Sequence, residues 1–192
     1  MLFRPIIYLV SSVLFTQAAL AALTPDQVVT NVGIVTSISG DLNSILSGLT
    51  NVETPAHVVN VAKTVTTDLE SMISKLLGDL TARDATTPFT DDEAEPIVDA
   101  LRHVLLSTVI GKQTIFAQFG LTGPIAEVLR RLEARIDSFS SSMTDLVPTR
   151  KDEVASAKAS LDSSVRNAYT KYEEICIPSP LYPAVPPVCA SL

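Results

Sequence analysis

The amino-acid sequence predicts an all-α fold, an antiparallel bundle of about five long amphipathic helices followed by a proline-rich C-terminal tail. Apolar residues recur at steps of three and four over long segments, which places them on one face of a helix. Hydrophobic residues make up 46% of the chain and aromatic residues only 5%, so aliphatic side chains must fill the core. The seven glycines are spread out, and no segment shows the alternation typical of a strand.

The first residues have the pattern of a secretory signal. Arg4 precedes a short apolar run, and small residues at cleavage spacing follow, so we expect cleavage after Ala19 or Ala21. The apolar run is too short to span a membrane comfortably. We therefore predict a signal peptide over residues 1–21, a helical bundle over 22–176 and a proline-rich tail over 177–192.

The predicted helices begin at recognisable capping residues. Thr24 is followed three residues later by Gln27, and the third predicted helix has the same capping-box arrangement at Thr90. A proline occupies the first helical position after Thr24 and after Thr54. Thr149 is expected to cap the fifth helix.

The fourth predicted helix, residues 123–146, has the longest unbroken apolar stripe and should be the helix that the others cover. Its stripe consists of Ile125, Val128, Leu129, Leu132, Ile136, Phe139, Met143 and Leu146. The stripe of the fifth helix consists of Val154, Ala157, Leu161, Val165, Ala168, Tyr172 and Ile175. In the third helix, Pro96 lies beyond the first turn, which predicts a kink or a restart.

The chain has two cysteines, Cys176 and Cys189, and their state depends on the compartment. In a secreted protein we expect them to pair with each other, with an intermolecular bridge as the alternative. The internal bridge would close a loop of about 14 residues, a stabilisation of ~3 kcal/mol on the chain-entropy model.

The charge pattern excludes several function classes. The formal charge is −7, and without Arg4 of the leader it is −8, from 13 basic and 21 acidic residues. Because no basic run is present, we expect no nucleic-acid partner. His57 and His103 are isolated, and no motif of a metal site, nucleophile or phosphate loop is complete, so we expect no enzyme, no metal and no cofactor. The acids of residues 91–95 are expected to cap a helix rather than to bind Ca²⁺.

Several predicted helices are apolar over more than a narrow seam, as in residues 104–110. The simplest explanation is that these side chains form the core. Long helices filled with medium-sized aliphatic side chains also leave space between them, and such spaces are common sites for apolar ligands.

Three stretches carry a resemblance to a known family. They are Glu93–Leu101, Ile110–Gln113 with Phe116, and the apolar stripe of residues 125–146. Over roughly residues 24–148, the chain resembles the fungal hydrophobic surface-binding protein A family, which includes cell-wall galactomannoprotein antigens. The resemblance implies an extracellular or cell-wall helical bundle that binds hydrophobic surfaces or long-chain lipids such as fatty acids, without enzymatic activity.

The resemblance also implies possible partners and a location. Members of the family are associated with recruiting secreted lytic hydrolases to waxy or polymeric surfaces, and related antigens capture fatty acids in the bundle interior. This chain lacks the long Ser/Thr-rich stalk, the anchor signal and the glycosylation sequon of wall-anchored members. We therefore expect free secretion, with no transmembrane segment in the mature chain.

These observations lead to a predicted ligand site between the third and fourth helices. Its apolar lining is predicted to comprise Leu105, Val109, Phe116, Leu129, Leu132, Ile136 and Phe139. Polar head-group contacts are predicted from Lys112, Gln113 or Tyr169. Two rival hypotheses remain open: a surface adhesin or recruiter that spreads its helices on a hydrophobic surface without an internal pocket, and a secreted effector that binds a partner protein through an exposed apolar helix face.

Overall fold

The computed structural model describes residues 24–81, 88–102 and 111–190. These residues form six α-helices, one 3-10 helix and a two-stranded ribbon, which confirms the all-α class. The elements are α1 (Pro25–Gly48), α2 (Pro55–Thr81), α3 (Asp91–Arg102), α5 (Gln113–Gln118), α6 (Thr122–Leu146), η1 (Pro148–Arg150), α7 (Lys151–Tyr172), β1 (Ile175–Ile177) and β2 (Val188–Ala190). Within the described ranges, no helix is long and apolar enough to cross a membrane.

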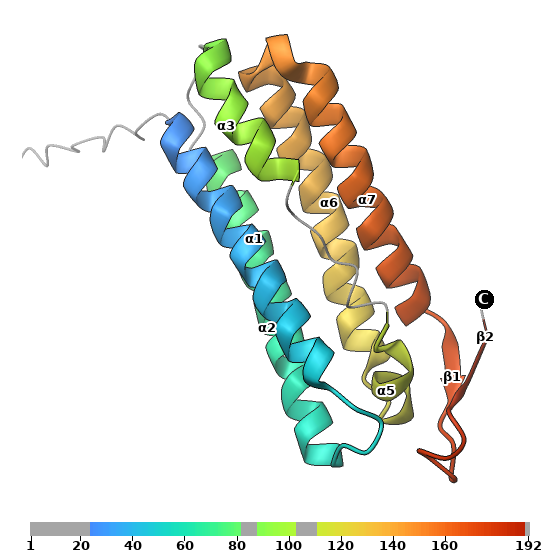
Figure 1. The fold of residues 1–192 in the computed structure, drawn as a ribbon. Helices are drawn as coiled ribbons and strands as arrows, with labels where there is room; N and C mark the ends of the chain where they lie inside the picture. Colours follow the sequence, from blue (N-terminus) through green and yellow to red (C-terminus); the bar gives the residue numbers. More distant parts are fainter. Residues whose placement is uncertain (1–23, 82–87, 103–110, 191–192) are drawn as a thin grey trace, which may run out of the picture.

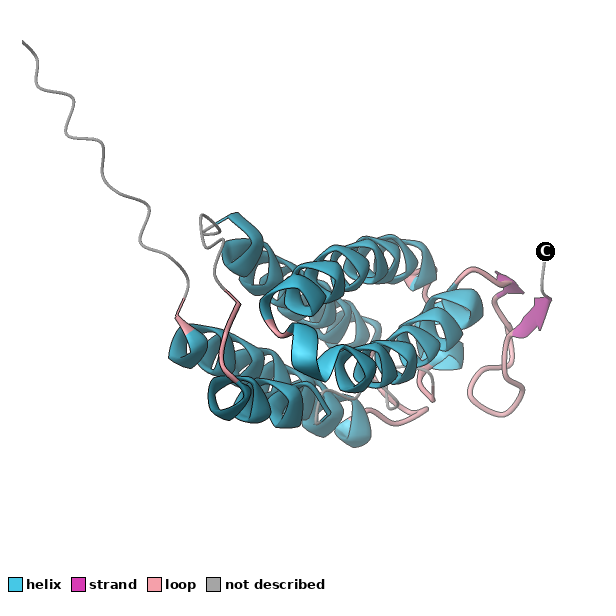
Figure 2. Ribbon diagram, turned by 90° about the horizontal axis from the view of Figure 1, so that it is seen from above, coloured by secondary structure: helices cyan, strands magenta, loops and turns pink. Residues whose placement is uncertain are grey.

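Four long helices lie side by side in the order α1, α2, α6, α7, as Figure 1 shows. The short helix α3 contacts both α1 and α7, so it closes the row of helices at one end of the bundle. At the other end, α5 fits against α2, α6 and α7. The ribbon of β1 and β2 lies at this second end and stands out to the side of the helices, as the view from above shows (Figure 2).

The capping interactions predicted at Thr24 and Thr90 are present. The Thr24 hydroxyl accepts a hydrogen bond from the Gln27 amide at 3.3 Å, and the Gln27 side chain accepts one from the Thr24 amide at 2.9 Å. The Glu93 carboxylate accepts hydrogen bonds from the amide and the hydroxyl of Thr90 at 2.8 and 2.9 Å. These bonds hold the pKa of Glu93 below its usual value, because they stabilise the charged form.

The predicted stripe of α6 is the centre of the core. All eight of its residues are buried, and they pack between α2 and α7. Removing a side chain of this size from water contributes about 1.5–3 kcal/mol. The periodicity of residues 123–146 therefore identified both the helix and its inner face.

The start and the end of the fifth helix differ from the prediction. Thr149 does not cap α7; it lies in η1, where its hydroxyl donates to the Asp91 carboxylate, and α7 begins at Lys151 without a side-chain cap. Pro148 favours this tight turn because it fixes the backbone at the first position of η1. Ile175 was placed on the helix stripe, but α7 ends at Tyr172 and Ile175 is an exposed strand residue.

Of the kink or restart predicted at Pro96, the restart is wrong, and the kink stays a prediction. Helix α3 runs through this residue from Asp91 to Arg102. Pro96 removes one backbone donor near the beginning of the helix, and its ring is exposed. The capped first turn and the burial of Ala94, Ile97 and Val98 hold the helix together across it.

The tail was predicted without a strand, yet it folds into a short antiparallel ribbon. Cys176 pairs with Cys189 in the strand register, and the two form the predicted disulfide. The buried Gln113 amide donates to both sulfur atoms, at 3.1 and 3.4 Å. Gln118 adds two hydrogen bonds to the backbone of Ser179, at 2.9 and 3.0 Å. Strands of three residues are too short for an alternating pattern to reveal them.

Because these contacts fasten the ribbon to α5, loss of the disulfide should release the ribbon and leave the four long helices packed. We predict that Cys176→Ser with Cys189→Ser lowers the free energy of unfolding by ~3 kcal/mol on the chain-entropy model. Urea unfolding followed by circular dichroism measures this change. A loss of most of the helical signal in the absence of urea would show that the bundle itself depends on the ribbon.

Candidate ligand site between the helices

A narrow cavity lies between the four long helices. Its lining is almost wholly apolar and comes from α1, α2, α6 and α7. The lining residues are Val32, Val35, Met72, Leu76, Leu132, Ile136, Phe139, Ser140, Val154, Ala157, Lys158 and Leu161. The cavity therefore lies at the meeting point of four helical stripes.

The cavity is almost closed. Its volume is about 20 Å³, little more than one water-sized sphere of ~10–15 Å³. Pockets for small molecules usually have a volume of about 300–1,000 Å³. A ligand with a long chain would therefore enter only if the helices moved apart or the lining side chains changed rotamers.

Three of the predicted lining residues, Leu132, Ile136 and Phe139, face this cavity. Leu129 and Phe116 are buried elsewhere in the core, and Phe116 packs on the ring of Tyr172 at 6.1 Å between centroids. Leu105 and Val109 lie outside the described residues. The site was expected between the third and fourth helices, whereas the cavity uses α1, α2 and α7 together with α6.

The polar residues predicted to bind a head group do not line the cavity. Gln113 contacts the disulfide, and the Lys112 ammonium donates to the backbone oxygen of Leu49 at 2.8 Å. Both side chains fasten segments at the end of the bundle that carries the ribbon. Tyr169 is half-buried and lies outside the lining.

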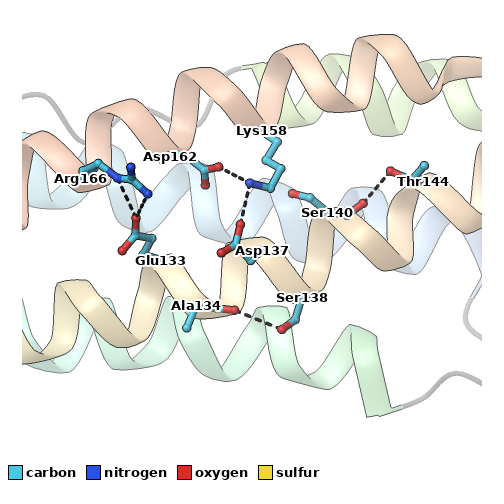
Figure 3. Close-up of polar contacts among 9 residues, drawn as sticks. All are labelled: Glu133, Ala134, Asp137, Ser138, Ser140, Thr144, Lys158, Asp162 and Arg166. Atoms are coloured by element: carbon cyan, nitrogen blue, oxygen red, sulfur yellow. Dashed lines mark hydrogen bonds and ion pairs between the residues drawn. The ribbon is translucent and has the colours of Figure 1, made fainter.

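The polar groups that do line the cavity are Ser140 on α6 and Lys158 on α7, and the sequence analysis missed both. Lys158 is held between two carboxylates (Figure 3): its ammonium lies 2.6 Å from Asp137 on α6 and also bonds Asp162, one turn along α7. Asp137, and next Asp162, raise the pKa of Lys158, because they favour its charged form.

Ser140 differs from the serines around it. It is 8% exposed, and its hydroxyl makes no hydrogen bond with any described residue, whereas Ser138 on the outer face donates to the Ala134 backbone oxygen at 3.1 Å. The backbone oxygen of Ser140 accepts from the Thr144 hydroxyl at 2.9 Å (Figure 3). A polar side chain in the wall of an apolar cavity is a candidate for orienting a ligand.

Of the two histidines, the structure describes only His57, and it lies on the surface. His57 is exposed and lies 3.7 Å from Glu53, and His103 is outside the described residues. Across the described ranges, no group of three or more His, Cys, Asp or Glu side chains is placed to hold a metal ion.

The fold matches solved structures, although no family model and no curated protein sequence matches the chain. AFMP4P, in complex with palmitic acid, has a TM-score of 0.66 at 13% identity, and the match covers 78% of this chain and 99% of that one. Ligand-binding domain 1 of the Penicillium marneffei MP1 protein, complexed with arachidonic acids, has a TM-score of 0.64 at 12% identity, with 75% of this chain and 95% of that one covered.

A second domain of the same protein is also similar. Ligand-binding domain 2 of Penicillium marneffei MP1, in complex with arachidonic acids, has a TM-score of 0.59 at 11% identity, with 75% of this chain and 90% of that one covered. The chain therefore shares nearly the whole fold of these fungal ligand-binding domains. At such low identity, the likeness concerns the fold and not the residues that line the cavity.

The ion pairs of Lys158 lead to a prediction for alkaline pH. The folded pKa of Lys158 is raised above 10.5, so its stabilisation is complete below that pH and is lost as the pH rises through the folded value. We predict that Lys158→Met lowers the free energy of unfolding by about 1 kcal/mol at neutral pH. Urea unfolding at a series of pH values should show the gap between the two proteins closing above pH 10.5.

The matched control is Lys151→Met, at the exposed start of the same helix and without an ion pair among the described residues. It should change stability by less than about 0.5 kcal/mol at every pH. A gap for Lys158→Met that stays constant with pH would contradict the role given to its ion pairs.

Proposed function

We propose that the protein binds a long-chain lipid, of the fatty-acid type, between α1, α2, α6 and α7. The observation that carries this proposal is the cavity lined by apolar side chains of all four long helices. The similar folds of AFMP4P and MP1, solved with palmitic and arachidonic acids, support it. No catalytic role is proposed, and the bound lipid is cargo rather than substrate.

We further propose that the chain is a secreted relative of the fungal hydrophobic surface-binding and galactomannoprotein family. Its disulfide is typical of proteins from an oxidising compartment. The likeness to fungal ligand-binding domains over about three quarters of the chain supports the same assignment. In this proposal residues 1–21 are a cleaved signal, and the protein is released rather than held in the wall.

The small volume of the cavity defines how a ligand would enter. The stripes close on one another around this small cavity, so the lipid chain must replace contacts between helices with contacts to itself. Apolar contacts are exchanged for apolar contacts, which keeps the cost of opening low compared with exposing the same side chains to water.

Ala157 provides a direct test, because it lines the cavity from α7 with a small side chain. We predict that Ala157→Phe fills the space and weakens binding of a long-chain lipid by at least about tenfold, or ~1.4 kcal/mol. Displacement of a neutral fluorescent probe, N-phenyl-1-naphthylamine, measures the binding. The matched control, Ala159→Phe, places the same ring on the exposed face of the same helix and should leave the affinity unchanged.

A second variant shows whether a weaker affinity of Ala157→Phe comes from the filled cavity or from a folding defect. Val154→Ala enlarges the cavity by two methyl groups at another lining position and should permit binding at least as tight as in the native protein. Thermal melts of all three variants report whether they fold. Folded Ala157→Phe protein that binds lipid as the native protein does would place the ligand elsewhere.

A second candidate function, binding to hydrophobic surfaces, is favoured by the outer face of the ribbon. Five of the six strongly exposed large aliphatic residues in the described chain lie on it: Ile175, Ile177, Leu181, Val185 and Val188. They expose on the order of 500 Å² of apolar surface, the size of a patch that is often functional. From residue 175 to the end, the sequence contains no charged side chain.

The strand register explains this face. Ile177 lies opposite Val188, and the residues that alternate with them, Cys176 and Cys189, face the bundle and Gln113. We predict that Ile177→Ser with Val188→Ser lowers adsorption to octyl-coated beads by about tenfold or more. Ala155→Ser with Ala159→Ser, on the exposed face of α7, is the control. Equal adsorption of both double variants would exclude the ribbon as the adsorbing surface.

A further inference from the structure

A wider cleft lies at the end of the bundle that carries the ribbon. It is formed by the turn between α1 and α2, the end of α5 and the loop between β1 and β2. Its volume is about 500 Å³, within the range of about 300–1,000 Å³ that is usual for small-molecule sites. We call it the ribbon cleft, and its lining residues are Asn51, Val52, Glu53, Gln118, Phe119, Ser179, Pro180, Tyr182 and Pro183.

Hydrogen bonds within each wall hold the ribbon cleft in shape. On the ribbon side, the Gln118 side chain bonds the amide and the carbonyl of Ser179, at 2.9 and 3.0 Å. On the opposite side, the Glu53 carboxylate accepts from the hydroxyl and the amide of Thr50, at 3.0 and 3.4 Å. Because both walls are already ordered, a ligand spends little of its binding free energy on shaping the cleft.

Two aromatic rings meet in the lining of the ribbon cleft. The rings of Phe119 and Tyr182 lie 6.1 Å apart between centroids, and their planes are at 80° to each other. Pro180 and Pro183 extend the apolar part of the lining. Nearly perpendicular rings form a corner in which a cation can lie within about 6 Å of both centroids, the range of a cation–π attraction.

The charge of the lining also favours a cation. Among the described residues that line the ribbon cleft, Glu53 alone carries a charge at neutral pH, and its side chain is 24% exposed. The imidazole of His57, 3.7 Å from Glu53, adds no charge when it is neutral. The Lys112 ammonium, at the same end of the bundle, donates to the backbone oxygen of Leu49 and is not part of the lining.

Two rings, two prolines and one carboxylate together fit a quaternary ammonium group. Its methyl groups pack against the rings and prolines, and its charge is attracted by the ring faces and by the carboxylate. It has no N–H group, so it needs no hydrogen-bond acceptor. A primary ammonium carries three donors and is strongly hydrated, so the apolar part of the cleft suits it less well.

The ribbon cleft borders the apolar outer face of the ribbon. Leu181, which lies between two lining residues in the sequence, is 66% exposed, and Val52 in the opposite wall is 79% exposed. A free choline molecule would leave these apolar side chains in water. A choline group that belongs to a lipid surface would bring apolar material to cover them, so the position of the cleft favours a lipid head group.

We propose that the ribbon cleft binds the choline head group of phosphatidylcholine, in a lipid surface onto which the ribbon adsorbs. This inference rests on surface binding by the ribbon, the second function proposed above, and names the surface. The ribbon cleft shares no lining residue with the cavity between the four long helices.

Vesicles of two lipids test the proposal: palmitoyl-oleoyl phosphatidylcholine and palmitoyl-oleoyl phosphatidylethanolamine, which have the same chains and no net charge. Sedimentation of the protein with the vesicles measures binding, and we expect it to be at least about fivefold tighter for phosphatidylcholine. Equal binding to both lipids, or binding to octyl-coated beads alone, would overturn the inference and leave adsorption by the ribbon intact. If neither vesicles nor beads bind the protein, both proposals fail.

Two substitutions in the ribbon cleft separate the head group from the apolar surface. Glu53→Gln removes the charge, and Phe119→Leu removes the aromatic face but keeps an apolar side chain. Each should weaken binding to phosphatidylcholine vesicles by about threefold to fivefold and leave adsorption to octyl-coated beads unchanged. The control, Glu127→Gln, removes one charge from the exposed face of α6 and should change neither.

Thermal melts followed by circular dichroism show which variants fold. If Phe119→Leu does not fold, Glu53→Gln alone decides, because its side chain lies in a surface turn and the glutamine oxygen still accepts from Thr50. Native-like binding of the folded cleft variants to phosphatidylcholine would overturn the assignment of the head group. An equal effect of Glu53→Gln and Glu127→Gln would mean that only the total charge of the protein matters, which would also overturn it.

Discussion

The burial of one face of α6 is the constraint on which the rest of the structure depends. This helix packs against α2 on one side and α7 on the other, and its eight stripe residues are all buried. Once α6 is placed, α1 adds to α2, and α3 bridges α1 and α7. The cavity is the space that remains where the four stripes meet, so its apolar character follows from the packing of the bundle.

The sequence predicted the helices better than the site, for a physical reason. A stripe such as that of residues 125–146 depends only on local periodicity, and the capping pair Thr24 and Gln27 depends on neighbours three residues apart. Lys158 is different, because its partner Asp137 lies on another helix, and only the packing of α6 against α7 brings the two together. Likewise, Gln113 was expected at a head group, but the fold places it on the disulfide.

The fold alone does not determine what the cavity holds. The solved structures with fatty acids share this architecture at 11–13% identity, which leaves nearly every lining residue free to differ. The aliphatic stripes must be retained in any such bundle because they form the core. The core does not require particular polar residues at the edge of the cavity, so these positions can differ between proteins that share the fold.

The ribbon gives the molecule two unlike ends. Charged side chains are distributed along the helices as far as Glu174, and none follows in the ribbon, whose outer face is aliphatic. A protein with charged side chains over most of its length and an apolar surface at one end has the amphipathic character of a surfactant. If the ribbon is the adsorbing surface, as proposed above, the molecule would lie at a boundary between water and an apolar phase with the ribbon in the apolar phase and the helices in water. In that arrangement the bundle would adsorb without unfolding, because the disulfide-closed ribbon, rather than the core, would meet the apolar phase.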